Sequence, residues 1–227
     1  QLRAIGVEIR LNAPVDGIHP TEQGLAVDLS GRERQHFERV LVTTSPGLMA
    51  RLAPALPREY LQGLLNLKHM GAVVMTLSLK HQLSEDGYYW FNLPKNEGYP
   101  FLALVEHTNY VSAEHFGGEH ILYCGDYLEN DHEYFDLSEA ELLECFIPTL
   151  ERINPKFQRE WILKTWLNRT KYAQPVPEVH HSKNIPNIET PVEGLYFASM
   201  SQVYPWDRGT NFAVEIGRRA AKLMMSF

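Results

Sequence analysis

The sequence predicts an α/β protein in which strands and helices follow one another in mixed order. Several short stretches alternate apolar and polar side chains, as half-buried strands do, and other stretches repeat apolar residues at helical spacing. These elements lack the regular strand–helix alternation of a complete doubly wound fold. Taken alone, the chain is therefore predicted to be of the α+β kind.

The composition is typical of a soluble globular protein and argues against some functions. The 227 residues are 44% hydrophobic, which is enough for the core of one large domain or two modest ones. The formal net charge is −7 and no run of five like charges occurs, so nucleic acid is not expected as the main partner. No apolar stretch is long enough to span a bilayer, and no signal-peptide pattern opens the chain. The two cysteines form no CxxC pair, so we expect no disulfide framework and a reducing, cytoplasmic setting.

Strand patterns fill the first part of the chain. Residues 7–11 alternate apolar and polar side chains, and residues 15–18 begin a second extended segment. Residues 25–29 alternate again after a turn-rich stretch, which predicts a hairpin. Residues 37–44 contain the wholly apolar run Val40-Leu41-Val42, which is typical of a strand covered on both faces.

Two helices and a group of strands are predicted next. Residues 48–52 and 57–67 place apolar side chains at helical spacing, with Pro57 suited to a first-turn position. The strands that follow are separated by turn residues such as Asn, Gly and Pro. They cover residues 71–79, 88–93, 101–106 and 120–127.

The remaining part alternates helices, strands and a long loop. Ser138-Glu139-Ala140-Glu141 is a capping box that begins a helix, and Asn154-Pro155 ends it. Residues 160–167 predict a strand, and residues 170–190 a loop broken by prolines. Residues 195–198 predict a short buried strand.

The polar loop after this last strand connects it to an amphipathic helix that begins at Gly209. A strand–loop–helix arrangement of this kind places backbone N–H groups and the positive end of a helix where an anionic or electron-rich ligand can bind. Tyr172 and Trp206 lie in polar, proline-containing segments where burial in a core is difficult. Both are therefore candidates for contact with an organic substrate, with core packing as the alternative.

Several common site motifs are absent from the sequence. It holds no GxGxxG and no GxxxxGK[ST], so it lacks a self-contained dinucleotide or P-loop site. The Glu–His pairs at 106–107, 114–115 and 119–120 are poor chelators because adjacent residues on a strand point to opposite faces, so we expect no metal site. No GxSxG elbow positions a serine nucleophile. Cys124 and Cys145 lie among apolar residues and are expected to pack in the core.

Three stretches together resemble one group of enzymes. They are Gly6-Val7-Glu8-Ile9-Arg10-Leu11 with its continuation to Ile18, Phe37 to Pro46, and Gly194-Leu195-Tyr196-Phe197-Ala198 with its continuation to Ala221. In their order and spacing they are similar to segments of the flavin-dependent amine oxidases, protoporphyrinogen oxidases and phytoene desaturases. The third stretch is the most specific of the three.

This resemblance implies an FAD domain and a substrate domain. Residues 1–50 and 188–227 are then segments of a Rossmann-like FAD domain, and residues 51–187 form a substrate-binding domain with a mixed sheet covered by helices. The FAD-binding residues that it implies are Val15, Ser199, Gly209, Thr210, Asn211 and Phe212. The candidate substrate-binding residues are Tyr172, Trp206 and Arg208, and no catalytic residue is identified.

The activity implied is the oxidation of a C–N or C–H bond of a small organic substrate, by hydride transfer to FAD. The GxGxxG of such enzymes lies upstream of the stretches matched here. Because the chain opens at Gln1 without Met, we expect it to be the C-terminal part of a longer protein whose N-terminal nucleotide-binding half is its partner. We expect this part alone to be inactive and to hold no FAD.

Two departures from the family pattern leave alternatives open. Ser199-Met200 stands where these enzymes have Gly followed by Asp or Glu, which removes a carboxylate from the expected flavin site. Asp207-Arg208 stands at the entry to the last helix, where Asp207 suits a helix cap and Arg208 suits either an anionic group or a surface ion pair. A non-redox flavoenzyme of the galactopyranose mutase type is one alternative, although residues 51–187 hold few arginines. A non-catalytic binding module is the other.

Overall fold

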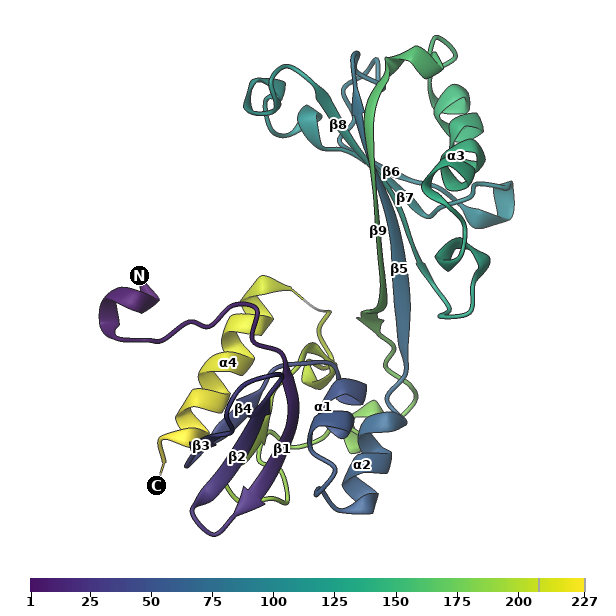
Figure 1. The fold of residues 1–227 in the computed structure, drawn as a ribbon. Helices are drawn as coiled ribbons and strands as arrows, with labels where there is room; N and C mark the ends of the chain where they lie inside the picture. Colours follow the sequence, from purple (N-terminus) through teal and green to yellow (C-terminus); the bar gives the residue numbers. More distant parts are fainter. Residues whose placement is uncertain (208, 227) are drawn as a thin grey trace. The chain divides into compact units, whose positions relative to one another are not determined.

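The computed structural model describes residues 1–207 and 209–226, which divide into two compact units. Unit 1 consists of Gln1–Lys68 with Pro175–Phe227, and unit 2 of His69–Gln174. The units have separate hydrophobic clusters. Both combine strands with helices (Figure 1), so the mixed α/β class predicted from the sequence is confirmed. None of the helices in the described residues is both long enough and apolar enough to cross a membrane.

Unit 1 contains an antiparallel sheet and a separate parallel pair of strands. The antiparallel sheet has the order β1-β2-β3, formed by β1 (Val15–Thr21), β2 (Gly24–Leu29) and β3 (Gln35–Phe37). The predicted hairpin is therefore present. The parallel pair consists of β4 (Val40–Val42) and β10 (Leu195–Phe197), with Leu195 opposite Val40 and Phe197 opposite Val42. This pair joins two segments that lie far apart in the sequence.

Helices cover both faces of the parallel pair. On one face, Val42 and Phe197 pack in a cluster with Met49 of α1 (Pro46–Leu52) and Leu64 of α2 (Arg58–Leu65). On the other face, Tyr196 packs with residues of α4 (Thr210–Met224), which include Ile216 and Ala220 (Figure 1). The apolar run at residues 40–42 is thus a strand covered on both faces, as expected for a parallel strand.

The unit boundaries differ from the expected ones at 50/51 and 187/188 because the flanking segments pack with unit 1. Leu64 of α2 belongs to the same cluster as Phe197 of β10. The hydroxyl of Tyr60 donates a hydrogen bond to the carbonyl oxygen of Asn187, which anchors the segment before β10 on α2. The division gives the extent of each unit and assigns neither of them a function.

The strand predicted over residues 7–11 is wrong. The chain there is extended or irregular, and the side chains of Val7 and Leu11 are 42% and 72% exposed. A strand needs a neighbouring strand for its backbone hydrogen bonds, and no strand of the described residues pairs with this segment. Residues 7–11 have the alternating pattern of a strand, but the described part of the chain contains no strand that pairs with them.

Unit 2 is a five-stranded sheet with a helix packed against it. The strand order is β6-β7-β8-β5-β9. The strands are β5 (His69–Leu79), β6 (Trp90–Asn92), β7 (Ala103–Glu106), β8 (His120–Leu128) and β9 (Ile162–Pro175). The long β5 and β8 pair in antiparallel register, from Gly71 opposite Leu128 to Leu79 opposite His120.

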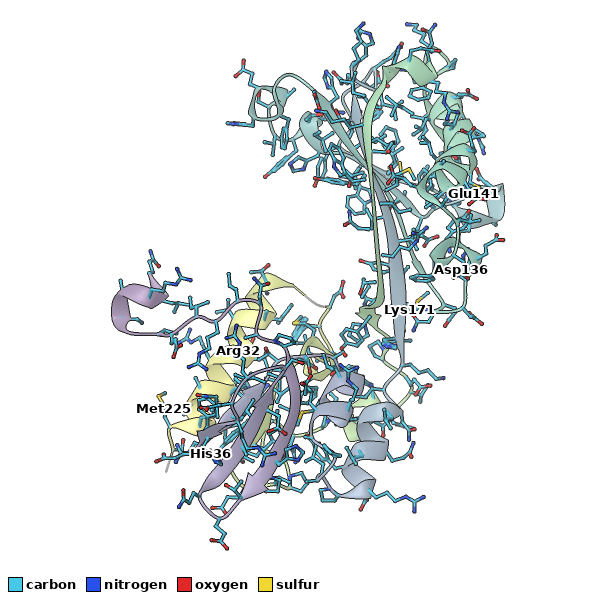
Figure 2. The ribbon with its side chains drawn as sticks, in the orientation of Figure 1. Arg32, His36, Asp136, Glu141, Lys171 and Met225 are labelled. Carbon is cyan, nitrogen blue, oxygen red and sulfur yellow. The ribbon has the colours of Figure 1, made fainter. Side chains whose placement is uncertain are left out.

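The helix of unit 2 is α3 (Glu139–Ile153), and its start confirms the predicted capping box. Ser138 Oγ accepts the backbone N–H of Glu141, and the Glu141 carboxylate accepts the backbone N–H of Ser138 at 2.8 Å. Figure 2 labels Glu141 at α3. Phe146 and Leu150 then pack against Met75 and Leu77 of β5. Asn154 ends the helix, as predicted.

Two further predictions for unit 2 are corrected. Residues 170–175 belong to β9 rather than to a loop, because the strand continues as far as Pro175 at the boundary of the unit. Cys124 is buried, but Cys145 is exposed because it lies on the outer face of α3, between the buried Leu142 and Phe146. Both cysteines are free.

Gly194 determines how the parallel pair begins. Its φ of +76° lies in a region that L side chains rarely adopt, and a Cβ built on it would lie 2.6 Å from the carbonyl oxygen of Glu38. Its own carbonyl oxygen accepts the backbone N–H of Val40 at 2.9 Å. The two chains approach each other closely here because residue 194 has no side chain.

We therefore predict that Gly194→Ala destabilises the full-length protein by about 2 kcal/mol or more, through backbone strain and the clash with Glu38. The measurement is urea unfolding followed by far-ultraviolet circular dichroism. Gly47→Ala is the matched control, because it lies in α1 with no atom near the added Cβ, and it should change the unfolding free energy little. Equal effects of the two substitutions would contradict this account.

Candidate functional site

The carboxyl ends of β4 and β10 meet at one edge, because the two strands are parallel. Thr43, Thr44 and Ser45 leave β4 at this edge, and Ala198 and Ser199 leave β10. The two exits are joined directly, since the backbone N–H of Ala198 donates to the carbonyl oxygen of Val42 at 3.0 Å. Ligands of open α/β sheets bind outside the carboxyl ends of the strands. We call this edge, with the segments that leave it, the carboxyl edge.

Gln202 fixes the chain where it leaves β10. It lies in a short 3-10 turn (Met200–Gln202) and is 8% exposed. Its Oε1 accepts the backbone N–H of Ser199 at 2.7 Å, and its Nε2 donates to the carbonyl oxygens of Phe197 and Pro186, both at 3.0 Å. This amide thus connects the end of β10, the turn after it and the segment before it. Gln202 was not among the residues expected at the site, although the Ser-x-x-Gln spacing of residues 199–202 is a capping-box signal.

The N-cap residue of α4 is Gly209, and no acidic residue lies in the first turn of the helix. Asp207 therefore does not occupy the N-cap position. The first N–H groups of α4, at Thr210, Asn211 and Phe212, form the positive end of a helix, which suits an electron-rich group of a ligand. Arg208 lies outside the described residues.

Aromatic side chains surround a small cavity beside this helix end. The rings of Trp206 and Phe212 are stacked, with centroids 6.3 Å apart and an interplanar angle of 10°. They line a cavity of about 110 Å³ together with apolar and charged residues, which include Ile216, Glu215 and Arg219. Trp206 is 66% exposed, so it is available to a ligand rather than committed to a core.

Val15 lies in a second cavity, which opens where β4 ends. This cavity has a volume of about 460 Å³ and is lined mainly by apolar residues of β1, β2, β4 and α1. Thr43 and Thr44 line it as well, so it reaches the carboxyl edge. The expected cofactor residues therefore fall into two places, with Val15 beside the end of β4 and Ser199 to Phe212 between β10 and α4.

Tyr172 lies in unit 2, on β9, and is half-buried. Its ring packs against that of His69 on β5, with centroids 4.9 Å apart. Burial lowers the pKa of His69 below its usual value. The two side chains form a small aromatic pair within unit 2.

Two other groups of polar residues lie away from the carboxyl edge. A cavity of about 370 Å³ at the opposite edge of the parallel pair is lined by Glu38, Glu189 and Glu193 among others, but this is the amino edge of the strands, where ligands of such sheets do not bind. Glu106, from one of the Glu–His pairs, is buried and accepts the backbone N–H groups of Leu83 and Ser84. Within the described residues, no three His, Cys, Asp or Glu side chains are grouped so that they could hold a metal ion.

Comparison with known proteins gives a family and a fold. A family model described as flavin containing amine oxidoreductase matches residues 1–225. No curated protein matches the sequence. Among solved structures, the fold is similar to that of a proposed protoporphyrinogen oxidase from Exiguobacterium sp. 255-15, with a TM-score of 0.72 and 15% identity over 97% of this chain and 48% of that one.

Two amine oxidases have similar folds. A putrescine oxidase solved with bound putrescine has a TM-score of 0.69 and 19% identity over 98% of this chain and 50% of that one. A cyclohexylamine oxidase from Brevibacterium oxydans IH-35A has a TM-score of 0.69 and 16% identity over 93% of this chain and 47% of that one. At these identities the likeness shows the fold alone. The chain spans about half the length of each of these proteins.

The contacts of Gln202 generate a prediction. Gln202→Leu keeps the size of the side chain but leaves the N–H of Ser199 and the carbonyl oxygens of Phe197 and Pro186 without their partner. We expect the unfolding free energy of the full-length protein to fall by about 2–4 kcal/mol, because buried polar groups without partners are costly. Gln23→Leu, at an exposed turn position, is the control and should have an effect within about 0.5 kcal/mol. A loss no larger than that of the control would show that the Gln202 amide does not hold the end of β10.

Proposed function

The chain belongs to the flavin containing amine oxidoreductase family, and from that premise we propose that the full-length protein is an FAD-dependent oxidoreductase that oxidises a C–N or C–H bond of a small organic substrate. The observation that carries this proposal is the carboxyl edge of β4 and β10, where the N-terminus of α4 and an apolar cavity lie beside the same parallel pair. Unit 1 is then the FAD domain and unit 2 the substrate-binding domain.

The residues of the carboxyl edge fit parts of FAD. An apolar cavity that reaches Val15 suits a flat ring system such as adenine. The backbone N–H groups at the start of α4 suit the electron-rich edge of the flavin ring, and Thr210 and Asn211 lie there. The sequence offers no GxGxxG loop for the pyrophosphate. We therefore propose that an N-terminal nucleotide-binding half of the same protein completes the site.

The proposed contacts with the substrate come from the aromatic side chains near the start of α4. When bound, FAD accepts a hydride equivalent from the substrate, while the protein supplies orientation and an apolar environment. Trp206 and Phe212 provide apolar walls for the small cavity beside them, which Glu215 and Arg219 also line. Tyr172, on unit 2, and Arg208, which lies outside the described residues, stay candidate substrate-binding residues from the sequence alone. Because two proteins of similar fold are named for putrescine and cyclohexylamine, we propose a small amine as the substrate. A cytoplasmic location stays a prediction.

The direct test is the absorbance spectrum of the purified full-length protein. We expect flavin absorption bands, and we expect anaerobic addition of a small primary amine to bleach them as the flavin is reduced. A full-length protein without flavin bands would overturn the oxidoreductase proposal. Flavin bands that no amine bleaches would overturn the amine substrate and favour a non-redox flavoenzyme.

Residues 1–227 expressed alone provide the second arm of this test. We expect a colourless preparation, because the pyrophosphate site is absent from the sequence. A yellow preparation with one flavin per chain would contradict the proposed division of the cofactor site between two halves.

A further inference from the structure

One edge of the unit 2 sheet is formed by the short strand β6. In the part of the chain that the structure describes, β6 has β7 on one side and no strand on the other. The carbonyl oxygen of Tyr89 and the N–H of Leu93, at the two ends of β6, form hydrogen bonds with residues 106 and 102 on the side of β7. Because these directions alternate along an antiparallel strand, the N–H and C=O groups of Trp90 and Asn92 point away from β7. They are available to another strand.

The strand at the other end of the sheet, β9, is protected against pairing with a second copy of itself. It has 14 residues and holds Lys164, Arg169 and Lys171 but no acidic residue. Charged side chains on an edge strand oppose edge-to-edge association, because two copies would bring like charges together. β6 consists of Trp90-Phe91-Asn92 and holds no charged residue. Of the two edges, β6 is the one that lacks this protection.

Exposed aromatic side chains surround β6. Tyr88, Tyr89, Trp90 and Tyr110 are 58%, 39%, 52% and 79% exposed, and the ring centroids of Tyr89 and Tyr110 are 5.3 Å apart. Tyr and Trp are enriched in protein interfaces, and exposed apolar patches mark sites of association. From the usual area of an aromatic side chain, these residues together expose roughly 400 Å². A standard interface buries about 800 Å² per partner, so they supply much of a small one.

A buried carboxylate fixes the chain beneath this aromatic surface. Glu106 is 0% exposed, and its two oxygens accept the backbone N–H groups of Leu83 and Ser84 at 2.6 and 2.8 Å. Asn109 Nδ2 donates to Glu106 Oε2 and to the carbonyl oxygen of Tyr88, both at 2.9 Å. Ordering a loop on association costs free energy. These bonds order the segment before β6 in advance, so that cost is reduced.

Two copies of β6 are complementary in antiparallel orientation. When Phe91 of one copy faces Phe91 of the other across a twofold axis, Trp90 lies opposite Asn92 and their outward N–H and C=O groups pair. The next position would need an N–H from Pro94, which has none. Tyr88 would lie opposite that proline, and its carbonyl oxygen already accepts a side-chain N–H. The pairing therefore ends without leaving an unsatisfied group.

The charges beside β6 are also complementary. Antiparallel pairing places the segment before β6 of one copy beside the segment after β6 of the other. The exposed Asp86 precedes the strand, and Lys95, whose side chain is 52% exposed, follows it. Glu97, further along, pairs with Arg152 of its own chain. Opposite charges therefore meet at both ends of the paired strands.

We propose that the full-length protein forms a reversible twofold dimer in which β6 of one copy pairs with β6 of a second copy, so that the unit 2 sheets become one continuous sheet. The partner is a second copy of this chain, because the strand edge, the aromatic surface and the flanking charges each complement themselves. The proposal does not depend on the proposed function.

Sedimentation velocity of the full-length protein over a range of concentrations tests this proposal. We expect the fraction of dimer to rise with concentration. Trp90→Lys should raise the dissociation constant of the dimer about tenfold or more, because it places a charge on the paired edge. Trp166→Lys, on β9, is the matched control, since Trp166 is 45% exposed, and it should leave the constant unchanged. A wild type that stays monomeric up to about 100 μM, or equal effects of the two substitutions, would overturn the proposal.

A second variant covers the case in which circular dichroism shows that Trp90→Lys does not fold. Asp86→Lys changes an exposed position outside the strand. It should weaken the dimer severalfold at low salt and less at high salt, because it replaces an attraction to Lys95 by a repulsion that salt screens. An Asp86→Lys variant that dimerises as the wild type does would overturn the antiparallel arrangement.

Amide hydrogen exchange at low and high protein concentration identifies the surface. Exchange at Trp90 and Asn92 should slow as the dimer forms, while exchange along β9 stays the same. Protection at another surface with none at β6 would overturn the proposal. Slow exchange at β6 at every concentration would also overturn it, because another part of the full-length protein would then cover this edge.

Discussion

The parallel pairing of β4 with β10 is the interaction on which the rest of unit 1 depends. It brings residues 40–42 beside residues 195–197, and the cores on its two faces are built from α1 and α2 on one side and α4 on the other. A parallel pair needs both faces covered, so each of these helices has a defined place against it. The same pairing places two strand ends side by side, and the candidate site lies at those ends.

At the carboxyl edge, the protein forms its own hydrogen bonds to the backbone of β10. Gln202 satisfies the backbone at the end of β10, and Gly194 allows the close approach at its start. The N-terminus of α4 lies beside the same strand ends. A site whose main chain is fixed by the protein itself is preorganised for a ligand.

Much of this arrangement could be predicted from the sequence because it depends on local signals. The capping box at Ser138 and Glu141, the hairpin of residues 15–29 and the apolar run at 40–42 each specify their own structure. Residues 7–11 show where such reasoning fails, because an alternating pattern says nothing about whether a partner strand is present. The strand predicted over residues 160–167 was too short, since Pro175 suggested a loop from residue 170 onwards, although a proline is tolerated at the last residue of an edge strand. The hydrogen bond between the hydroxyls of Ser199 and Ser201 could not be predicted, because it depends on two side chains that meet only in the folded turn.

The central claim is that FAD binds at the carboxyl edge of β4 and β10. Amide hydrogen exchange of the full-length protein, with and without FAD, tests it most directly. The account predicts that FAD slows exchange at residues 43–45 and 199–212 and leaves the amino edge at residues 189–194 unchanged. Protection of the amino edge, with no change at the carboxyl edge, would contradict it.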